Sequence, residues 1–287
     1  LFPDFKTKFE EIPLPTDFKK EYNYGEYYLN QFLKYEKKSI FSKHKKTPAL
    51  IISSKGCNNN CSYCTMKRAL GPVKSYPLEV IGDNYRKLKK KGHHVFVFNA
   101  DDTGAYGIDI GKTFADLLDY CDKIDQEFNN KSTTWIIDNL HPMWALKYEV
   151  ALNRYIQKGK ISEMIIPLQA GSDRLLTLMK RKYQIEDIKQ CLNKFKSNNK
   201  KLLIKTHFII GFPNEELSDI ESIRDIINEK YFGHYIFLKY FEAEDSNSAQ
   251  IFPKISDEKV YERIDYLEKI MKENNTEYLK DGIISKC

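Results

Sequence analysis

Six short and almost fully apolar segments, separated by longer stretches with helical periodicity, constrain this chain most strongly. Fully apolar strands that alternate with helices of about 10–15 residues indicate βαβ units and a parallel sheet. Six such units in series favour an α/β fold, an open six-stranded partial (β/α)6 barrel, over a doubly wound sheet. In that fold the binding site lies at the carboxyl ends of the strands. The strands are expected at residues 49–53, 95–98, 133–137, 164–166, 202–210 and 235–240, and the intervening helices at 77–91, 113–126, 144–157, 173–180, 186–197 and 218–228.

The two ends of the chain depart from this alternation. Residues 1–47 are rich in Lys, Tyr and Phe, and we interpret them as a linker or packing extension with one helix near Tyr27–Lys37. Residues 48–287 form the expected core barrel, closed by a long charged helix from Asp257 to about Lys280. The chain begins at Leu1 and not at Met, which is typical of an excerpt from a longer protein.

Hydropathy and cysteine content limit where in the cell this protein is expected. The sequence contains no run of 18 apolar residues, which excludes a membrane-spanning helix. Its first residues lack the basic-then-apolar order of a signal peptide. Six cysteines in 287 residues are too few for a disulfide scaffold. We therefore expect a cytoplasmic protein with no membrane contact.

Three of the cysteines crowd together directly after the first expected strand. Cys57, Cys61 and Cys64 follow the spacing Cys-x3-Cys-x2-Cys, with no fourth cysteine nearby. Thiolates are the preferred ligands of iron–sulfur clusters, and a four-iron cluster takes four ligands. Three protein thiolates leave one iron open to an outside ligand, which a catalytic cluster requires and a pure electron carrier avoids. The motif therefore predicts a catalytic metal centre in the first βα loop.

A zinc site is the alternative, with His93 or His94 completing a Cys3His set. Structural zinc sites more often use two Cys pairs or paired His, and both histidines precede a strand, at its far end from the loop. A zinc- or cluster-containing RNA-binding module would also show a basic face with exposed aromatics. Lys plus Arg exceed Asp plus Glu by only 46 − 40 = 6, and the 19 tyrosines are spread along the chain, which argues against that class.

The cysteine spacing, with aromatic Tyr63 just before the last cysteine, resembles the signature of the radical S-adenosylmethionine (SAM) superfamily. The resemblance implies a [4Fe-4S] cluster on Cys57, Cys61 and Cys64, with SAM chelated at the open iron and Tyr63 close to the cofactors. It also implies reductive cleavage of SAM to a 5′-deoxyadenosyl radical, with electrons from a reductase such as flavodoxin or ferredoxin.

Further segments are similar to the methylthiotransferase family of that superfamily, which methylthiolates tRNA or a peptide or protein. They are the loop Asn99–Gly107, Leu140-His141-Pro142, Pro167-Leu168-Gln169-Ala170-Gly171-Ser172-Asp173, the pair Met179 and Arg181, and Ile209-Ile210-Gly211-Phe212-Pro213. The N-terminal cluster-binding domain and the C-terminal TRAM domain of that family are absent from this sequence. A cobalamin-dependent radical SAM methyltransferase is the alternative, because Pro3-Asp4-Phe5 is similar to a stretch that precedes the barrel there.

The remaining candidate residues follow the expected strands. Gln169, Ser172 and Gly211 are predicted to contact SAM, although Ser is also a common helix N-cap. Asp101 and Asp102 are predicted to be catalytic and to face the substrate. No role is assigned to four further residues, namely His207, Cys121, Cys191 and Cys287.

Overall fold

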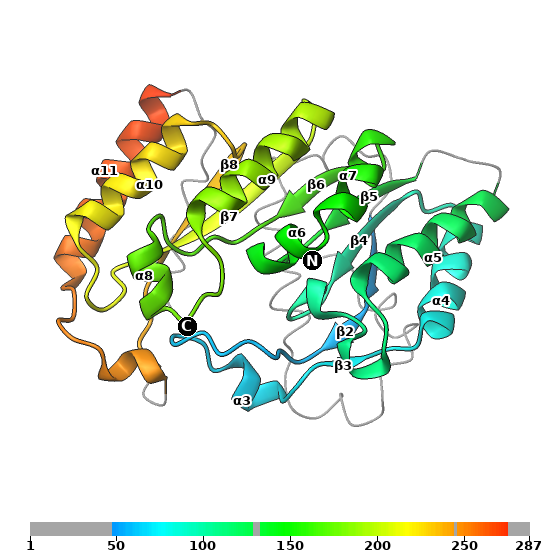
Figure 1. Ribbon diagram of the computed structural model, residues 1–287, viewed down its shortest axis with the longest axis horizontal. Helices are drawn as coiled ribbons and strands as arrows, with labels where there is room; N and C mark the ends of the chain where they lie inside the picture. The colour runs from blue at the N-terminus through cyan, green and yellow to red at the C-terminus, as the bar shows by residue number, and fades with distance from the viewer. Residues whose placement is uncertain (1–47, 129–132, 244–245, 275–287) are drawn as a thin grey trace.

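The computed structural model describes residues 48–128, 133–243 and 246–274. Its main sheet has six parallel strands whose spatial order follows the sequence (Figure 1). They are β1 (Ala49–Ile52), β4 (Val95–Asn99), β5 (Thr134–Ile137), β6 (Ile161–Ile165), β7 (Leu203–Ile210) and β8 (His234–Lys239). The two outermost strands, β1 and β8, are not paired to each other, so the expected open barrel of six βα units is confirmed. The helix expected at Tyr27–Lys37 and the extension 1–47 lie outside the described residues.

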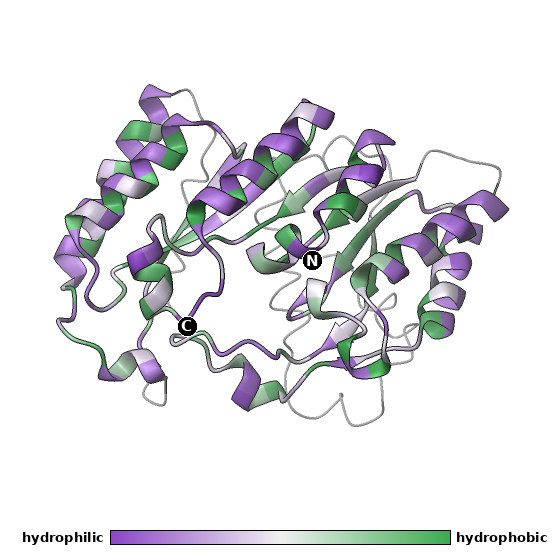
Figure 2. Ribbon diagram, in the orientation of Figure 1, coloured by the Kyte–Doolittle hydropathy of each residue, from purple (hydrophilic) through white to green (hydrophobic). Residues whose placement is uncertain are grey.

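Helices connect the strands and cover the outer face of the sheet, as Figure 1 shows. Most boundaries agree with the expectation to within two residues, and two differences are larger. Residues 144–157 form two helices that meet at Tyr148, and the fourth strand begins earlier than expected, at Ile161. In Figure 2 the covering helices carry both polar and apolar residues, as amphipathic helices do. The helices are α4 (Leu78–Lys90), α5 (Phe114–Glu127), α6 (Pro142–Lys147), α7 (Glu149–Gln157), α8 (Asp173–Leu178), α9 (Ile185–Asn198), α10 (Leu217–Asn228) and α11 (Asp257–Glu273).

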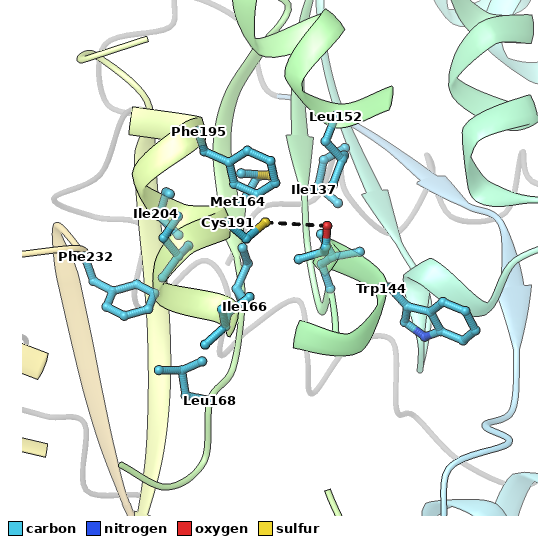
Figure 3. Packing of buried hydrophobic residues seen from close by; sticks show 14 of the residues in the cluster. Ile137, Trp144, Leu152, Met164, Ile166, Leu168, Cys191, Phe195, Ile204 and Phe232 are labelled. Carbon is cyan, nitrogen blue, oxygen red and sulfur yellow. Dashed lines mark hydrogen bonds between the residues drawn. The ribbon is translucent and has the colours of Figure 1, made fainter. Parts of the chain in front are cut away.

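The main hydrophobic core lies between the outer face of the sheet and these helices. Phe98 packs edge-on against Trp135 of the next strand, with ring centroids 5.6 Å apart, and against Phe114 of α5 at 6.3 Å. Figure 3 shows the same layer farther along the sheet, where Cys191 of α9 lies among apolar side chains. This apolar layer holds the helices on the sheet and leaves the strand ends free for loops.

The inner face of the sheet has a different composition. A small separate cluster of Val95, Val97 and Ile136 packs there. Register places Glu163 beside Ile136, and Glu163 forms a buried ion pair with Lys205 of β7 at 2.5 Å. The inner face is therefore partly charged, while the outer face is mainly apolar and its helices α4 and α5 carry one buried ion pair, between Lys89 and Asp125 at 3.0 Å.

No helix in the described ranges is both long and apolar enough to cross a membrane.

Candidate metal and cofactor site

The three-cysteine loop leaves the barrel after β1 and is framed by a short hairpin, β2 (Ser54–Lys55) with β3 (Lys74–Ser75). The Cys57 amide donates to the Gly71 carbonyl, and the Val73 amide donates to the Asn58 side chain. Gly56 has φ +77°, and a Cβ there would lie 2.3 Å from the Pro72 carbonyl oxygen. Only glycine fits such a close approach of two backbone segments.

Each of the three cysteine sulfurs accepts one N–H hydrogen bond. The backbone amide of Asn59 donates to Cys57 Sγ and that of Met66 donates to Cys64 Sγ, each at 3.4 Å. Arg181 Nη1 donates to Cys61 Sγ at 3.9 Å. Such donors favour the thiolate, which is the form that binds metal. Burial nevertheless raises the pKa of Cys57 to about 11, with Asp102 adding to the rise, and it also raises the pKa of Cys64, so metal binding has to release the protons of these two thiols.

The donor set fits an iron–sulfur cluster better than a zinc ion. In the described part of the chain no three His, Cys, Asp or Glu side chains converge on a point where one ion could be bound. A single zinc ion draws all of its ligand atoms to within about 2.0–2.3 Å of one centre, whereas each iron of a cubane takes its own thiolate. His93 and His94 precede β4, at the strand end opposite the cysteine loop. Three cysteines in one loop supply the number of thiolates that a cubane with one open iron would take, so the cluster assignment stays a prediction for these residues.

Arg181 is a site residue that the sequence prediction did not include, although its motif was noted. It is 8% exposed, and besides Cys61 it donates to the Pro167 carbonyl at 2.6 Å and to the Tyr63 hydroxyl at 3.3 Å. Burial opposes its charge, yet the pKa of Arg181 lies above its ordinary value because Tyr63, Tyr183 and Cys61 favour the cation. Tyr63 is thus linked to the Cys61 ligand through a shared guanidinium.

Asp101 and Asp102, expected to face a substrate, hydrogen-bond to other groups of the protein. Asp101 accepts from the Gly56 amide at 2.8 Å. Asp102 accepts from Asn59 Nδ2 at 2.7 Å and from Trp144 Nε1 at 2.8 Å, and lies 4.0 Å from Cys57 Sγ. Burial raises the pKa of Asp102 to about 6, against the effect of these hydrogen bonds. Both carboxylates hold the cysteine loop, and a role toward substrate stays a prediction.

Ser62, in the middle of the cysteine loop, fixes it to two distant segments. Its amide and hydroxyl donate to the carbonyls of Met179 and Leu178 at the end of α8. Its own carbonyl accepts from the Ser248 amide, which belongs to the 3-10 helix Asn247–Gln250. The loop, which follows β1, is therefore fixed to the segments that follow β6 and β8.

Gln169 combines an unusual backbone conformation with an unpaired side-chain acceptor. Its φ is +74°, unusual for a residue with a side chain, and its backbone is bonded to His207 and Ile209 of β7. Its side-chain Oε1 is buried and has no hydrogen-bond partner among the described residues. An unpaired buried acceptor costs free energy unless a donor reaches it. This feature matches the predicted contact with SAM, which stays a prediction.

Ser172 and Gly211, which are predicted to contact SAM, both make contacts within the protein that support its local structure. The Ser172 hydroxyl accepts from the Leu175 amide, capping α8, and donates to the Asp219 carboxylate. Gly211 has φ +85°, and a Cβ there would lie 2.3 Å from Val260 of α11. The Gly211 amide donates to Glu215. The Ser172 carbonyl accepts from the Leu176 amide, so the hydroxyl and carbonyl of Ser172 and the amide of Gly211 are all hydrogen-bonded within the protein.

The residues without an assigned role are placed as follows. Burial lowers the pKa of His207 to about 4, so this histidine is neutral. Cys121 and Cys191 are buried between helices and sheet, and the Cys191 thiol donates to the Ala145 carbonyl (Figure 3). Cys287 lies outside the described residues. His207, Cys121 and Cys191 are all far in sequence from the cysteine loop.

Comparisons with known proteins agree with this geometry. The chain is 32% identical over 233 residues to a probable threonylcarbamoyladenosine tRNA methylthiotransferase of Methanocaldococcus jannaschii, an alignment that covers 78% of this chain and 52% of the relative. It is 31% identical over 285 residues to the ribosomal protein uS12 methylthiotransferase RimO of Caldicellulosiruptor saccharolyticus, covering 93% and 61%. The chain thus spans between about half and three fifths of the length of these relatives.

Solved structures show the same fold. The coproporphyrinogen III oxidase HemN of Escherichia coli matches with a TM-score of 0.58 at 11% identity, over 85% of this chain and 56% of that one. The radical SAM methyltransferase TsrM of Kitasatospora setae matches with 0.54 at 12% identity, over 67% and 36%. The model of the radical SAM superfamily matches residues 51–227, which include the cysteine loop and all the strands from β4 to β7. The chain belongs to the radical SAM superfamily, whose members use a [4Fe-4S] cluster and S-adenosylmethionine.

Proposed function

We propose that this chain is the catalytic core of a methylthiotransferase that acts on tRNA or on a peptide or protein. The observation that carries the proposal is the cysteine loop at the carboxyl end of β1, where three hydrogen-bonded sulfurs leave a fourth ligand position open. Its curated relatives are named methylthiotransferases of tRNA and of a ribosomal protein, which supports this reaction over cobalamin-dependent methylation.

Each site residue has one proposed task. Cys57, Cys61 and Cys64 hold the cluster, which when bound and reduced supplies the electron that cleaves SAM. The Gln169 Oε1 accepts a hydrogen bond from the amino group of SAM, because it is buried without another donor. Gly211 offers backbone to the adenine end. An unpaired buried acceptor costs free energy, so we expect a donor at Gln169 to add to SAM affinity.

The proposed setting is the cytoplasm, with a reductase such as flavodoxin or ferredoxin as electron donor. The donated sulfur is proposed to come from outside the described residues. Cys121 and Cys191 lie buried on α5 and α9, each apart from the cysteine loop, and a second cubane would need its own set of thiolates. We therefore expect about four irons on this chain, and SAM cleavage without a sulfur-bearing product.

The test is anaerobic reconstitution followed by incubation with SAM and a strong reductant. Wild type is expected to bind one cubane and to form 5′-deoxyadenosine. Replacing Cys57, Cys61 or Cys64 by Ala is expected to abolish both, while Cys191→Ala keeps both. Zinc as the bound metal, iron retained by Cys61→Ala, or a cluster without SAM cleavage would each contradict the proposal.

A further inference from the structure

Two buried charges of opposite sign lie against different sulfurs of the cysteine loop. The Arg181 guanidinium donates to Cys61 Sγ at 3.9 Å, and the Asp102 carboxylate lies 4.0 Å from Cys57 Sγ. Arg181 is 8% exposed and Asp102 is 3% exposed. Electrostatic effects at such depth are screened far less than at a surface. Both charges therefore act on whatever the sulfurs bind.

Neither charge is neutralised by an ion-pair partner. Arg181 contacts neutral acceptors, the Pro167 carbonyl and the Tyr63 hydroxyl, and no carboxylate in the described residues forms an ion pair with it. Its Nε is buried and without a hydrogen-bond partner there. Asp102 likewise contacts neutral donors, Asn59 and Trp144. Burying an unpaired charge is costly, so a fold that does it twice beside one loop has placed these charges for what the loop holds.

Each charge is anchored outside the cysteine loop. Arg181 follows α8, whose last carbonyls also hold Ser62. Asp102 follows β4 and is fixed by Trp144 of α6, against which Gly104 packs so closely that a Cβ would lie 2.2 Å from the indole. The distances to the sulfurs are therefore set by the barrel and not by the loop alone.

We propose that Arg181 and Asp102 are positioning residues that set the reduction potential of the cluster in opposite directions, Arg181 raising it and Asp102 lowering it. This inference rests on the proposed function, because it requires the cluster on Cys57, Cys61 and Cys64. Reduction adds one negative charge to the cluster, and cluster potentials depend on net charge and on hydrogen bonds to sulfur. A cation at Cys61 stabilises the reduced state, and an anion at Cys57 stabilises the oxidised state.

The test is a redox titration of the reconstituted protein at pH 8, with the reduced cluster followed by electron paramagnetic resonance. Arg181→Gln is expected to favour the oxidised cluster by about tenfold or more, which corresponds to a potential lower by about 59 mV for one electron. Asp102→Asn is expected to shift it upward, and Arg181→Lys is expected to stay nearer to wild type. The double variant Arg181→Gln/Asp102→Asn falls between the two single variants.

The matched control is Arg86→Gln, which removes one positive charge from exposed α4, where Arg86 pairs with Glu127. Its potential is expected to equal that of wild type. Equal potentials in wild type, Arg181→Gln and Asp102→Asn would overturn the inference. A shift of both variants in the same direction would overturn it too, since loosening of the loop and entry of water act with one sign. Should Arg181→Gln bind no iron, the other two variants decide. A higher potential in Asp102→Asn, with a potential near that of wild type in Arg181→Lys, then supports the inference. A potential in Asp102→Asn equal to that of wild type overturns it.

Failure of the proposed function gives a different result. A wild-type chain that binds zinc, or no cubane, refutes both proposals at once. If wild type binds a cubane but its reduction potential is unchanged in the Arg181 and Asp102 variants, only the inference about these two residues is refuted.

Discussion

The two faces of the main sheet are built from different chemistry although they share the same strands. The outer face presents Phe96, Phe98 and Trp135 to the helices, all fully buried. The inner face carries Glu163 and Lys205 at positions whose neighbours in sequence point outward. Apolar packing tolerates substitution by similar volumes, whereas a buried charge depends on an opposite charge held beside it. The comparison teaches that the outer face stabilises the barrel, while the inner face retains polar groups that stability alone does not require.

The largest effect is expected from breaking the inner ion pair. Glu163 is 0% exposed and Lys205 is 5% exposed, so Glu163→Gln removes the carboxylate that lies 2.5 Å from the buried Lys205 ammonium. We expect a loss of about 3–5 kcal/mol in the free energy of unfolding, measured by urea titration. The double variant Glu163→Gln/Lys205→Met removes both charges and is expected to recover most of that loss. A loss below about 1 kcal/mol in the single variant would mean that the inner face is hydrated.

The next effect is a pH dependence from Asp138, which follows β5 on the inner face and lies near Glu163 and Lys205. Burial raises the pKa of Asp138 to about 6, although Asn99 and the Asn139 amide donate to it. Because the folded pKa exceeds the unfolded value near 3.9, the contribution to stability is present below pH 4 and is lost as pH rises through 6. That loss is about 3 kcal/mol for a shift of two pKa units.

Asp138→Asn is expected to remove this pH dependence. The free energy of unfolding of the variant, measured by urea titration, is therefore expected to rise relative to that of wild type between pH 4.5 and 7. The matched control is Asp83→Asn, whose side chain is 81% exposed, and which is expected to keep the wild-type slope. Parallel pH profiles for wild type and Asp138→Asn would show that this carboxyl titrates normally.

A smaller effect is expected where the end of β7 meets the closing helix α11. Gly211→Ala forces a side chain into φ +85° and 2.3 Å from Val260, so we expect a loss of about 2–3 kcal/mol. The control Gly159→Ala has a similar φ of +69° but nothing within 4 Å of the new Cβ, and is expected to lose about 1 kcal/mol. Equal losses would mean that α11 moves aside.

The smallest effect is expected on the outer face. Cys191→Ala removes one buried sulfur from the apolar layer, at an expected loss of about 1 kcal/mol. Iron content is expected to be unchanged, because Cys191 is a packing residue. A lower iron content without loss of stability would instead indicate that Cys191 is a metal ligand and not a packing residue.

The sequence by itself determined the fold class and predicted the place of the metal centre. Six apolar segments fixed the number and order of the strands, because a parallel sheet buried on its outer face needs such segments and helices between them. The spacing of Cys57, Cys61 and Cys64 placed three predicted ligands in one loop, because residues so close in sequence are also close in space. Local patterns were less informative at boundaries, where α6 and α7 divide at Tyr148 and β6 begins at Ile161.

Only the tertiary structure decided what surrounds those sulfurs. Arg181 is 120 residues from Cys61 and Asp102 is 45 residues from Cys57, so no local pattern relates them. The same holds for Ser172, whose hydroxyl bonds Asp219, 47 residues away. Burial and charge at these positions arise only when the strand ends converge around the barrel, because the free energy of a buried charge depends on every group packed against it and not on its neighbours in sequence.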